Sequence, residues 1–444
     1  MNTSPPSSLR VAIVGAGWAG MAAAVRALQR GHQVTVFEAA RQLGGRARGV
    51  PLDLPDGRQV MVDNGQHILI GAYTDCLRLM RTVGVEPEQA LLRRPLALSY
   101  PDGAGLALPD WPAPLDAAAG ILCARGWSWG DKRALLGAAL RWRRAGFRCD
   151  ERLSVAELCA GLPPRPLREF IEPLCVSALN TPLAQASGQV LLRVLHDALL
   201  GGRDSSRLLL PRIDLSALFP QAAGHWAQAR GARILHGQRV DALHWQAPHW
   251  RVAGQVFDRV LLATSASNAA QMLTQSAQEA IDSIASQFHE WARSAAQLEH
   301  QAITTVYAQA APASAGRTLL RAPMLALRHG PQAPAQFVFD RDAITAPARP
   351  TGVLAFVVST SVGERDALQT AIARQAQAQL GLAVAPLLTV TDRRATFACT
   401  PGLRRPAAQI AAGLLAAGDY VAGPYPATLE GAVRSGLQAA DALG

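Results

Sequence analysis

Lysine is almost absent from this 444-residue chain: Lys132 is the only one, although the formal net charge is +10. The positive charge therefore comes from arginines, which are scattered along the sequence rather than gathered in a basic run with interleaved aromatic residues. A nucleic-acid groove needs such a run. We therefore expect no nucleic-acid partner.

Metal-ligand and targeting patterns are missing as well. The six cysteines contain no C-x-x-C pair and the ten histidines form no H-x-H, H-E-x-x-H or mixed Cys/His spacing, so we expect reduced thiols and no metal site. No window holds about 18 uninterrupted apolar residues, which argues against a membrane-spanning helix. The opening "MNTSPPSSLR" lacks the pattern of a signal peptide, and we expect a cytoplasmic protein.

What the sequence does have is a nucleotide fingerprint near its start. "RVAIVGAG" predicts a strand, "WAGMAAAVRALQR" a helix and "QVTVFEAA" a second strand, with G-x-G-x-x-G at the first turn and an acidic residue closing the second strand. The free N–H groups at the start of the helix would bind a pyrophosphate, and the acidic residue would accept hydrogen bonds from ribose hydroxyls. The candidate cofactor-binding residues here are Gly15, Gly17, Trp18, Ala19, Gly20 and Glu38.

A second glycine pair distinguishes FAD from NAD. Gly44, Gly45 and Arg46 follow the acidic residue, where a dehydrogenase needs nothing. An FAD enzyme gains an arginine beside the diphosphate and a chain that passes close to it. With the fingerprint, this pattern resembles the glutathione-reductase-like FAD fold of the amine oxidase and carotenoid desaturase superfamily.

That resemblance implies further contacts. "AGDYVAGPYPATLEGAVRSG", residues 417–436, is similar to the superfamily's C-terminal flavin motif, in which Asp419 would meet the ribityl–phosphate region and a helix starting near Ala427 would point at the flavin N1/C2 carbonyl. "GQRVDAL", residues 237–243, resembles the strand whose backbone brackets the adenine. The implied residues are Gly418, Asp419, Ala427, Thr428, Leu429 and Val240.

The sequence predicts an α/β protein of two domains. The first is an interrupted Rossmann-type FAD-binding domain, and the second is a mixed α+β substrate-binding domain whose helical parts are rich in Pro, Trp and Arg. We assign residues 1–84, 221–290 and 401–444 to the first domain and residues 85–220 and 291–400 to the second.

Four longer stretches narrow the family. "DNGQHILIGAYTDCLRLMRTVG", "FIEPLCVSALNTPLAQASGQVLLRVL", "GGRDSSRLLLPRIDLSALFP" and "YPATLEGAVRSG" resemble the squalene-associated FAD-dependent desaturases of hopanoid pathways, which act as hydroxysqualene dehydroxylases. The resemblance covers essentially the whole chain. It implies a hydrophobic C30 isoprenoid substrate, which would lose an allylic hydroxyl and receive a hydride from reduced flavin N5.

Other functions stay open from sequence alone. The alternatives are an oxidative isoprenoid or carotenoid-type desaturase, a flavin amine oxidase, and a flavoprotein without turnover. Lys132 lies in an expected surface helix, so the lysine that commonly holds a water against flavin N5 in amine oxidases is missing. No second nucleotide fingerprint or iron–sulfur spacing identifies the electron donor for FAD.

"DNGQHILIGAY", residues 63–73, is the candidate catalytic stretch. We expect the backbone at Gly65 and Gln66 to pack on the flavin. His67 is the best proton donor by type, because its unperturbed pKa lies near 6.5, although a hydrogen bond to a backbone carbonyl is an alternative role. Asp63 precedes Asn-Gly and is expected to make an Asx-type turn bond. The candidate catalytic residues are His67, Gln66 and Asp63.

One segment suggests a membrane contact. Residues 127–148 combine Trp127, Trp129 and Trp142 with a run of positive charge. Such a segment fits either peripheral binding at the inner face of the cell membrane or an ordinary surface helix.

Overall fold

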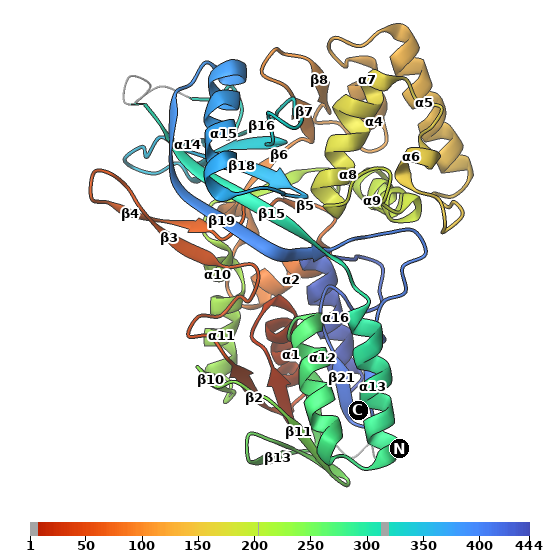
Figure 1. The fold of residues 1–444 in the computed structure, drawn as a ribbon, viewed down its shortest axis with the longest axis vertical. Coiled ribbons are helices and arrows are strands. Elements are labelled where there is room, and N and C mark those ends of the chain that lie inside the picture. The colour runs from red at the N-terminus through yellow and green to blue at the C-terminus, as the bar shows by residue number, and fades with distance from the viewer. Residues whose placement is uncertain (1–7, 203, 312–318) are drawn as a thin grey trace.

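A six-stranded sheet is assembled from the beginning, middle and end of the chain. The computed structural model describes residues 8–202, 204–311 and 319–444, so the segment without a signal-peptide pattern lies largely outside the described residues. The sheet lies in the lower part of Figure 1, and all its neighbouring strands are parallel except the last pair. In spatial order the strands are β10 (Arg233–His236), β2 (Gln33–Glu38), β1 (Arg10–Val14), β14 (Arg259–Leu262), β21 (Leu414–Ala416) and β20 (Gln409–Ala411).

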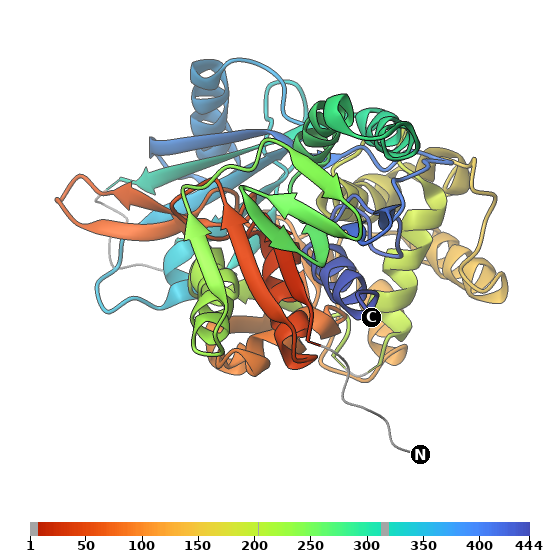
Figure 2. The same ribbon diagram turned by 90° about the horizontal axis from the view of Figure 1, so that it is seen from below.

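The expected strand–helix–strand unit opens this sheet. β1 is a buried apolar strand, and α1 (Trp18–Gln29) returns the chain to the parallel strand β2. α16 (Leu429–Asp441) packs on α1 so closely that a Cβ atom on Gly436 would lie 2.2 Å from the carbonyl oxygen of Ala19. Figure 2 shows α16 beside the red N-terminal strands. The first and last helices of the described chain are therefore packed against each other.

A five-stranded antiparallel sheet lies in the upper part of the molecule (Figure 1). Its long strand β15 pairs with both β18 and β19, and the side chains of Ile372 and Ala376 on α15 pack with Val306 and Phe356 of the sheet. The strand order is β16 (Met324–Ala326), β17 (Phe337–Asp340), β18 (Val353–Ser359), β15 (His300–Ala310) and β19 (Val384–Phe397), and the covering helix is α15 (Arg365–Leu380).

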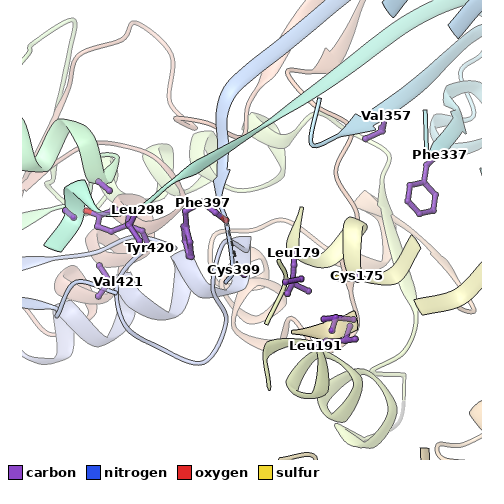
Figure 3. Close-up of a cluster of buried hydrophobic side chains, with 14 of the residues drawn as sticks. Cys175, Leu179, Leu191, Leu298, Phe337, Val357, Phe397, Cys399, Tyr420 and Val421 are labelled. Atoms are coloured by element: carbon purple, nitrogen blue, oxygen red, sulfur yellow. Dashed lines mark hydrogen bonds between the residues drawn. The ribbon is translucent and has the colours of Figure 1, made fainter. Parts of the chain in front are cut away.

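A helical region packs against the end of β19. Thr181 joins the two, because its hydroxyl accepts the Cys399 amide at 3.1 Å while its carbonyl accepts the Cys175 thiol at 3.6 Å. Figure 3 shows Leu179 and Leu191 on one side of Cys399 and Tyr420 on the other. The helices of this region are α4 (Leu115–Leu122), α5 (Trp129–Arg144), α6 (Val155–Leu158), α7 (Pro164–Pro166), α8 (Glu172–Leu179) and α9 (Gly188–Leu200), with a π-helical turn at Leu167–Ile171.

Short elements complete the fold. The small sheets are β3 (Gly49–Asp53) with β4 (Gln59–Asp63); β5 (Leu69–Ile70), β9 (Leu208–Pro211) and β6 (Leu91–Arg94); β7 (Ala97–Ser99) with β8 (Gly105–Ala107); and β11 (Leu243–Gln246), β12 (His249–Val252) and β13 (Gln255–Phe257). The remaining helices are α2 (Thr74–Thr82), α3 (Pro87–Ala90), α10 (Leu215–Leu218), α11 (Pro220–Gln228), α12 (Ala266–Ser276), α13 (Asp282–Ala296) and α14 (Arg341–Thr345), with a 3-10 turn at Ala277–Glu279.

Segment 127–148, for which either a membrane contact or an ordinary surface helix was expected, is only partly at the surface. Trp127 and Trp142 are buried, and Trp129 is exposed. The buried pair lies on the inner side of α5 and its N-terminal approach, where large aromatic rings fill the core. No helix in the described part of the chain is long and apolar enough to cross a bilayer. The division into two domains at the stated boundaries stays a prediction.

Candidate functional site

The glycine turn after β1 leaves a helix end open. Gly15 adopts a φ of +106°, and a Cβ on Gly20 would lie 1.9 Å from the Gly15 carbonyl oxygen, so the turn accepts no side chain at either position. Gly17 is the N-cap of α1 and has no side chain to bind the first helical amides. A Cβ added to Gly17 would meet nothing closer than Gly45 Cα at 3.8 Å. The first turn of α1 therefore has no side-chain cap, and uncapped amides at a helix N-terminus are groups that bind phosphate.

Glu38 lies beside this turn, and Val240 lies in the loop that follows β10. The Glu38 carboxylate accepts the Ala16 amide at 2.7 Å, and the Glu38 carbonyl accepts the Gln238 amide at 2.9 Å. The strand expected over residues 237–243 is wrong: β10 ends at His236, Gly237 turns with a φ of +68°, and strand structure resumes only at Leu243. Val240 is buried in the connecting loop rather than in a strand, and its contact with the adenine stays a prediction.

Arg46 and Asp419 connect the second glycine pair with the C-terminal motif. Gly44 donates its amide to the Ala16 carbonyl at 3.0 Å, which holds the second glycine pair against the first turn. The Arg46 guanidinium forms an ion pair with Asp419 and donates to the Ala395 carbonyl at 2.9 Å. The Asp419 carboxylate raises the pKa of Arg46, so Arg46 stays charged. Residues separated by most of the chain thus form one wall.

The C-terminal motif turns sharply into α16. Gly418 donates its amide to the Ser435 hydroxyl at 3.1 Å, and Ala427 adopts a φ of +55° before the helix. Thr428 is the N-cap, and its hydroxyl accepts the Gly431 amide at 2.9 Å. The helix therefore begins at Leu429, two residues beyond the expected start near Ala427, because the threonine caps it there.

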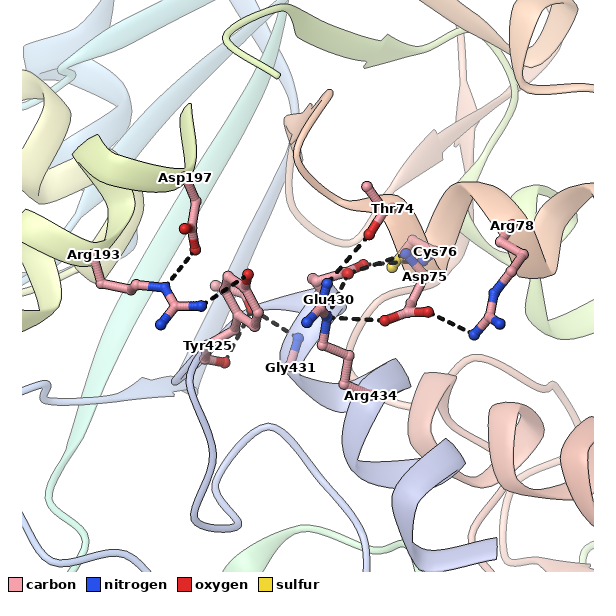
Figure 4. A network of polar contacts seen from close by, with 11 residues as sticks. Thr74, Asp75, Cys76, Arg78, Arg193, Asp197, Tyr425, Glu430, Gly431 and Arg434 are labelled. Carbon is pink, nitrogen blue, oxygen red and sulfur yellow. Dashed lines mark hydrogen bonds and ion pairs between the residues drawn. The ribbon is translucent and has the colours of Figure 1, made fainter. Parts of the chain in front are cut away.

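Sequence reasoning missed Glu430. Its carboxylate is fully buried and accepts the backbone amides of Asp75 at 3.1 Å and Cys76 at 3.0 Å, which are the first turn of α2 (Figure 4). The same carboxylate accepts a hydrogen bond from Nε of Arg434 at 2.7 Å. Tyr73, the N-cap of α2, has no side-chain hydrogen bond to the helix, so Glu430 caps α2 from a different helix. The lack of a capping residue before Thr74 was the only local signal.

Tyr425 extends this network to the helical region. Its ring lies between the guanidinium groups of Arg434 at 4.5 Å and Arg193 at 5.3 Å, and Arg193 pairs with Asp197 at 2.6 Å (Figure 4). Cations above aromatic faces are attracted by the ring quadrupole. The loop that precedes α16 is therefore held from both sides, by α9 and by α16 itself.

The stretch "DNGQH" contacts the upper sheet on one side and the chain after the second glycine pair on the other. The Gln66 side-chain oxygen accepts a hydrogen bond from the Arg341 guanidinium of α14 at 2.9 Å. The backbone N–H of Gln66 donates to the Thr305 hydroxyl of β15 at 3.4 Å. The Tyr307 hydroxyl of β15 donates to the Asp63 carbonyl at 2.7 Å. These contacts hold the stretch firmly on the upper sheet, while Asn64 binds the chain after the second glycine pair through Arg48 at 3.0 Å.

Asp63 does not make the expected Asx-type turn bond. Its Oδ1 accepts the Leu215 amide at 2.7 Å, at the start of α10, while Oδ2 is buried without a partner among the described residues. Asn64, the next polar side chain, also bonds at a distance in sequence: its Oδ1 accepts the Arg48 amide at 3.0 Å and its Nδ2 donates to the Arg46 carbonyl at 2.8 Å. Burial raises the pKa of Asp63 to about 7.

His67 hydrogen-bonds the nearest carbonyl. Its Nδ1 contacts the Gly65 carbonyl oxygen, and the ring is half-buried. Burial lowers the pKa of His67 below 6.5, so the neutral imidazole predominates at pH 7. With the Nδ1 proton donated to Gly65, Nε2 is the ring atom left for a ligand.

The Asp63 carboxyl makes stability pH-dependent. Its pKa is raised on folding from 3.8 to about 7, so the folded state binds the proton more tightly and this contribution is lost as pH rises from about 4 to 7. The asparagine of Asp63→Asn resembles the protonated carboxyl at every pH. We therefore expect this variant to lose the pH-dependent part of the unfolding free energy, which is up to about 4 kcal/mol in the wild type. The thermal unfolding midpoint measured from pH 4.5 to 8 tests this.

Asp53→Asn on the same hairpin is the matched control, because Asp53 is exposed. It should keep the wild-type slope of unfolding midpoint against pH. An unchanged slope in Asp63→Asn would show that the carboxyl does not hold its proton in the folded state.

Known proteins resemble this chain over its full length. The family model for flavin containing amine oxidoreductase matches residues 18–444. The chain is 28% identical to a hydroxysqualene dehydroxylase of Rhodopseudomonas palustris, covering 98% of both chains, and 26% identical to one of Zymomonas mobilis, covering 97% of both. A solved oxidoreductase from Methanosarcina mazei has the same fold, with a TM-score of 0.71, 16% identity and coverage of 98% of this chain and 100% of that one.

These matches confirm the resemblance and the α/β fold expected from the sequence, as well as the expected cofactor, FAD. They agree with the open end of α1 and the glycine pair that faces it. The chain belongs to the flavin containing amine oxidoreductase family and is an FAD-dependent oxidoreductase.

Proposed function

We propose that the protein reduces hydroxysqualene to squalene. The observation that carries the proposal is the match to hydroxysqualene dehydroxylases along 98% of both chains, which includes the regions between the cofactor motifs as well as the motifs themselves. A match limited to the nucleotide fingerprint would support a flavoprotein and no particular substrate. The substrate would be a hydrophobic C30 isoprenoid, and the reaction belongs to squalene and hopanoid biosynthesis.

The cofactor contacts are proposed from the geometry of the glycine turns. The amides of Trp18 and Ala19 at the start of α1, together with Gly44 and Gly45, would hold the diphosphate, and Glu38 would bind the ribose. Val240 would cover the adenine. Asp419, fixed by Arg46, would face the ribityl chain, and the free amides at the start of α16 would face the flavin ring.

The reaction balances with one hydride and one proton. When bound and reduced, FAD supplies a hydride to the carbon that carries the hydroxyl. The C–O bond breaks, a C–H bond forms, and the hydroxyl leaves as water after it receives a proton. The chain must therefore provide a proton donor, and it must exclude bulk water from the cationic carbon.

His67 is the proton donor that we propose. Its lowered pKa makes the imidazolium a stronger acid, and Nε2 is free of the Gly65 carbonyl that holds Nδ1. Gln66 would keep the loop in place through Arg341, while Asp63, enclosed against Leu215, would anchor the stretch on α10. Positioning by such contacts fixes the distance between acid and hydroxyl.

Anaerobic single turnover tests the reaction. Chemically reduced enzyme mixed with hydroxysqualene should form squalene and regain the absorbance of oxidised flavin in a one-to-one ratio. Oxidised enzyme with squalene should form no new double bonds. Flavin that stays reduced in the presence of hydroxysqualene would contradict the proposal, and new double bonds in squalene would support an oxidative desaturase instead.

The pH profile tests His67. Because burial lowers its pKa, the rate of squalene formation should fall about tenfold for each pH unit above a midpoint that lies below 6.5. His67→Gln should lower the rate by about 100-fold and lose this dependence, while the bound-flavin spectrum stays the same. Asn64→Ser, a control in the same loop, should keep the wild-type pH dependence. If wild type and His67→Gln showed the same pH profile, His67 would be excluded as the proton donor.

A further inference from the structure

Exposed apolar side chains gather on one part of the helical region. Eleven large hydrophobic side chains of the described residues are exposed, and five of them lie within 30 residues of sequence. Single exposed hydrophobics are normal on soluble proteins, but a cluster indicates an interaction surface. The five are Trp111, Leu115, Leu122, Trp129 and Leu140. Together with the basic side chains of α5, they form what we call the α4–α5 surface.

One face of α5 carries both apolar and basic side chains. Trp129, Leu136 and Leu140 are spaced by seven and four residues and therefore share a face of the helix. Trp129 is 71% exposed, the highest value among the exposed tryptophans. The positions beside this stripe are basic: Lys132, Arg133, Arg143 and Arg144. An apolar stripe bordered by cations is the pattern of helices that lie in a membrane interface.

The opposite face of α5 fixes this surface to the core. Leu135 and Trp142 are buried there, and Trp127, just before the helix, donates to the buried Glu169 carboxylate at 2.8 Å. α4 and α5 are joined by Lys132, whose ammonium donates to the Leu122 carbonyl at 2.8 Å and lies 5.0 Å from the Trp129 ring centre. The exposed face is thus held rigidly, on the outer rim of the molecule (Figure 1).

The acidic groups nearby do not neutralise the basic ones. Asp131 keeps its charge, but it caps the start of α5 through Ser128 and, two positions after Trp129, lies on another face of the helix than the stripe, while Asp110 pairs with Arg207. Asp116 is buried and accepts the Ser206 hydroxyl at 3.1 Å. The exposed charge of the α4–α5 surface is therefore positive, which complements an anionic lipid headgroup.

We propose that the α4–α5 surface binds the face of an anionic lipid bilayer, with Trp111, Trp129 and the leucines in the headgroup boundary and the basic side chains on lipid phosphates. A nucleic acid would use the charges and leave the leucines in water, and a second copy of this positively charged surface would be repelled. The surface binds without catalysis, so this inference is independent of the proposed reaction.

Vesicle co-sedimentation of the holoenzyme tests the proposal. Wild-type protein should sediment with phosphatidylglycerol–phosphatidylcholine vesicles at low salt and remain in solution with phosphatidylcholine alone. Each basic side chain near an anionic surface strengthens binding about fivefold. Arg133→Gln, Arg143→Gln and Arg144→Gln combined should therefore weaken binding about 100-fold, and Trp129→Glu with Leu140→Glu at least tenfold.

Matched variants separate this surface from general effects. Ile281→Glu removes an exposed side chain near α13, in the lower part of Figure 1, and Arg374→Gln removes an exposed charge on α15; both should bind like wild type. Brominated lipids should quench wild-type tryptophan fluorescence, and less so in Trp111→Phe with Trp129→Phe. Three results would overturn the proposal. They are an equal loss of binding in the surface and control variants, wild-type protein that stays in the supernatant, and a Trp129→Glu change that breaks a dimer in a protein that does not bind vesicles.

Discussion

The buried carboxylate of Glu430 is the interaction on which the geometry of the candidate site depends. It belongs to the first turn of α16 and caps the first turn of α2, so it joins the helix in which the C-terminal motif ends to the helix that follows "DNGQHILIGAY". A buried carboxylate without partners would cost several kcal/mol, and two amides with Arg434 satisfy it here. Any rearrangement that separated the two helices would leave that charge uncompensated. The proposed flavin side and the proposed acid side of the site are therefore set relative to each other by one side chain.

Two other contacts complete the frame. Arg46 and Asp419 bring the second glycine pair to the C-terminal motif, and Gln66 with Arg341 ties the catalytic stretch to the upper sheet. Each contact joins segments that are hundreds of residues apart in sequence, so the site exists only in the folded chain. The α4–α5 surface lies outside this frame. A protein whose proposed substrate is an isoprenoid of the bilayer could meet its substrate there without changing the chemistry of the site.

The local parts of this frame could be predicted from sequence and the long-range parts could not. The strand–turn–helix around Gly15 and Gly20 was predictable because steric limits act between neighbours in the chain. Glu430 was missed because its partners lie on another helix, and Val240 was assigned to a strand although Gly237 ends the preceding strand. The composition of segment 127–148 did not reveal that Trp127 and Trp142 are buried, because composition does not show which face of a helix packs on the core. Asp63 was expected to bond locally, and its real partner, the Leu215 amide, is set by tertiary packing.

Isotope transfer tests the central claim most directly. The hydrogen on reduced flavin N5 exchanges with solvent, so enzyme reduced anaerobically in D₂O carries deuterium at the position that would be delivered to hydroxysqualene. Mass spectrometry of the product should find one deuterium in each squalene molecule, at the carbon that carried the hydroxyl, and none for the reaction in H₂O. Squalene without deuterium from the D₂O reaction would contradict direct delivery from the flavin, and with it the arrangement of site and cofactor described for this protein.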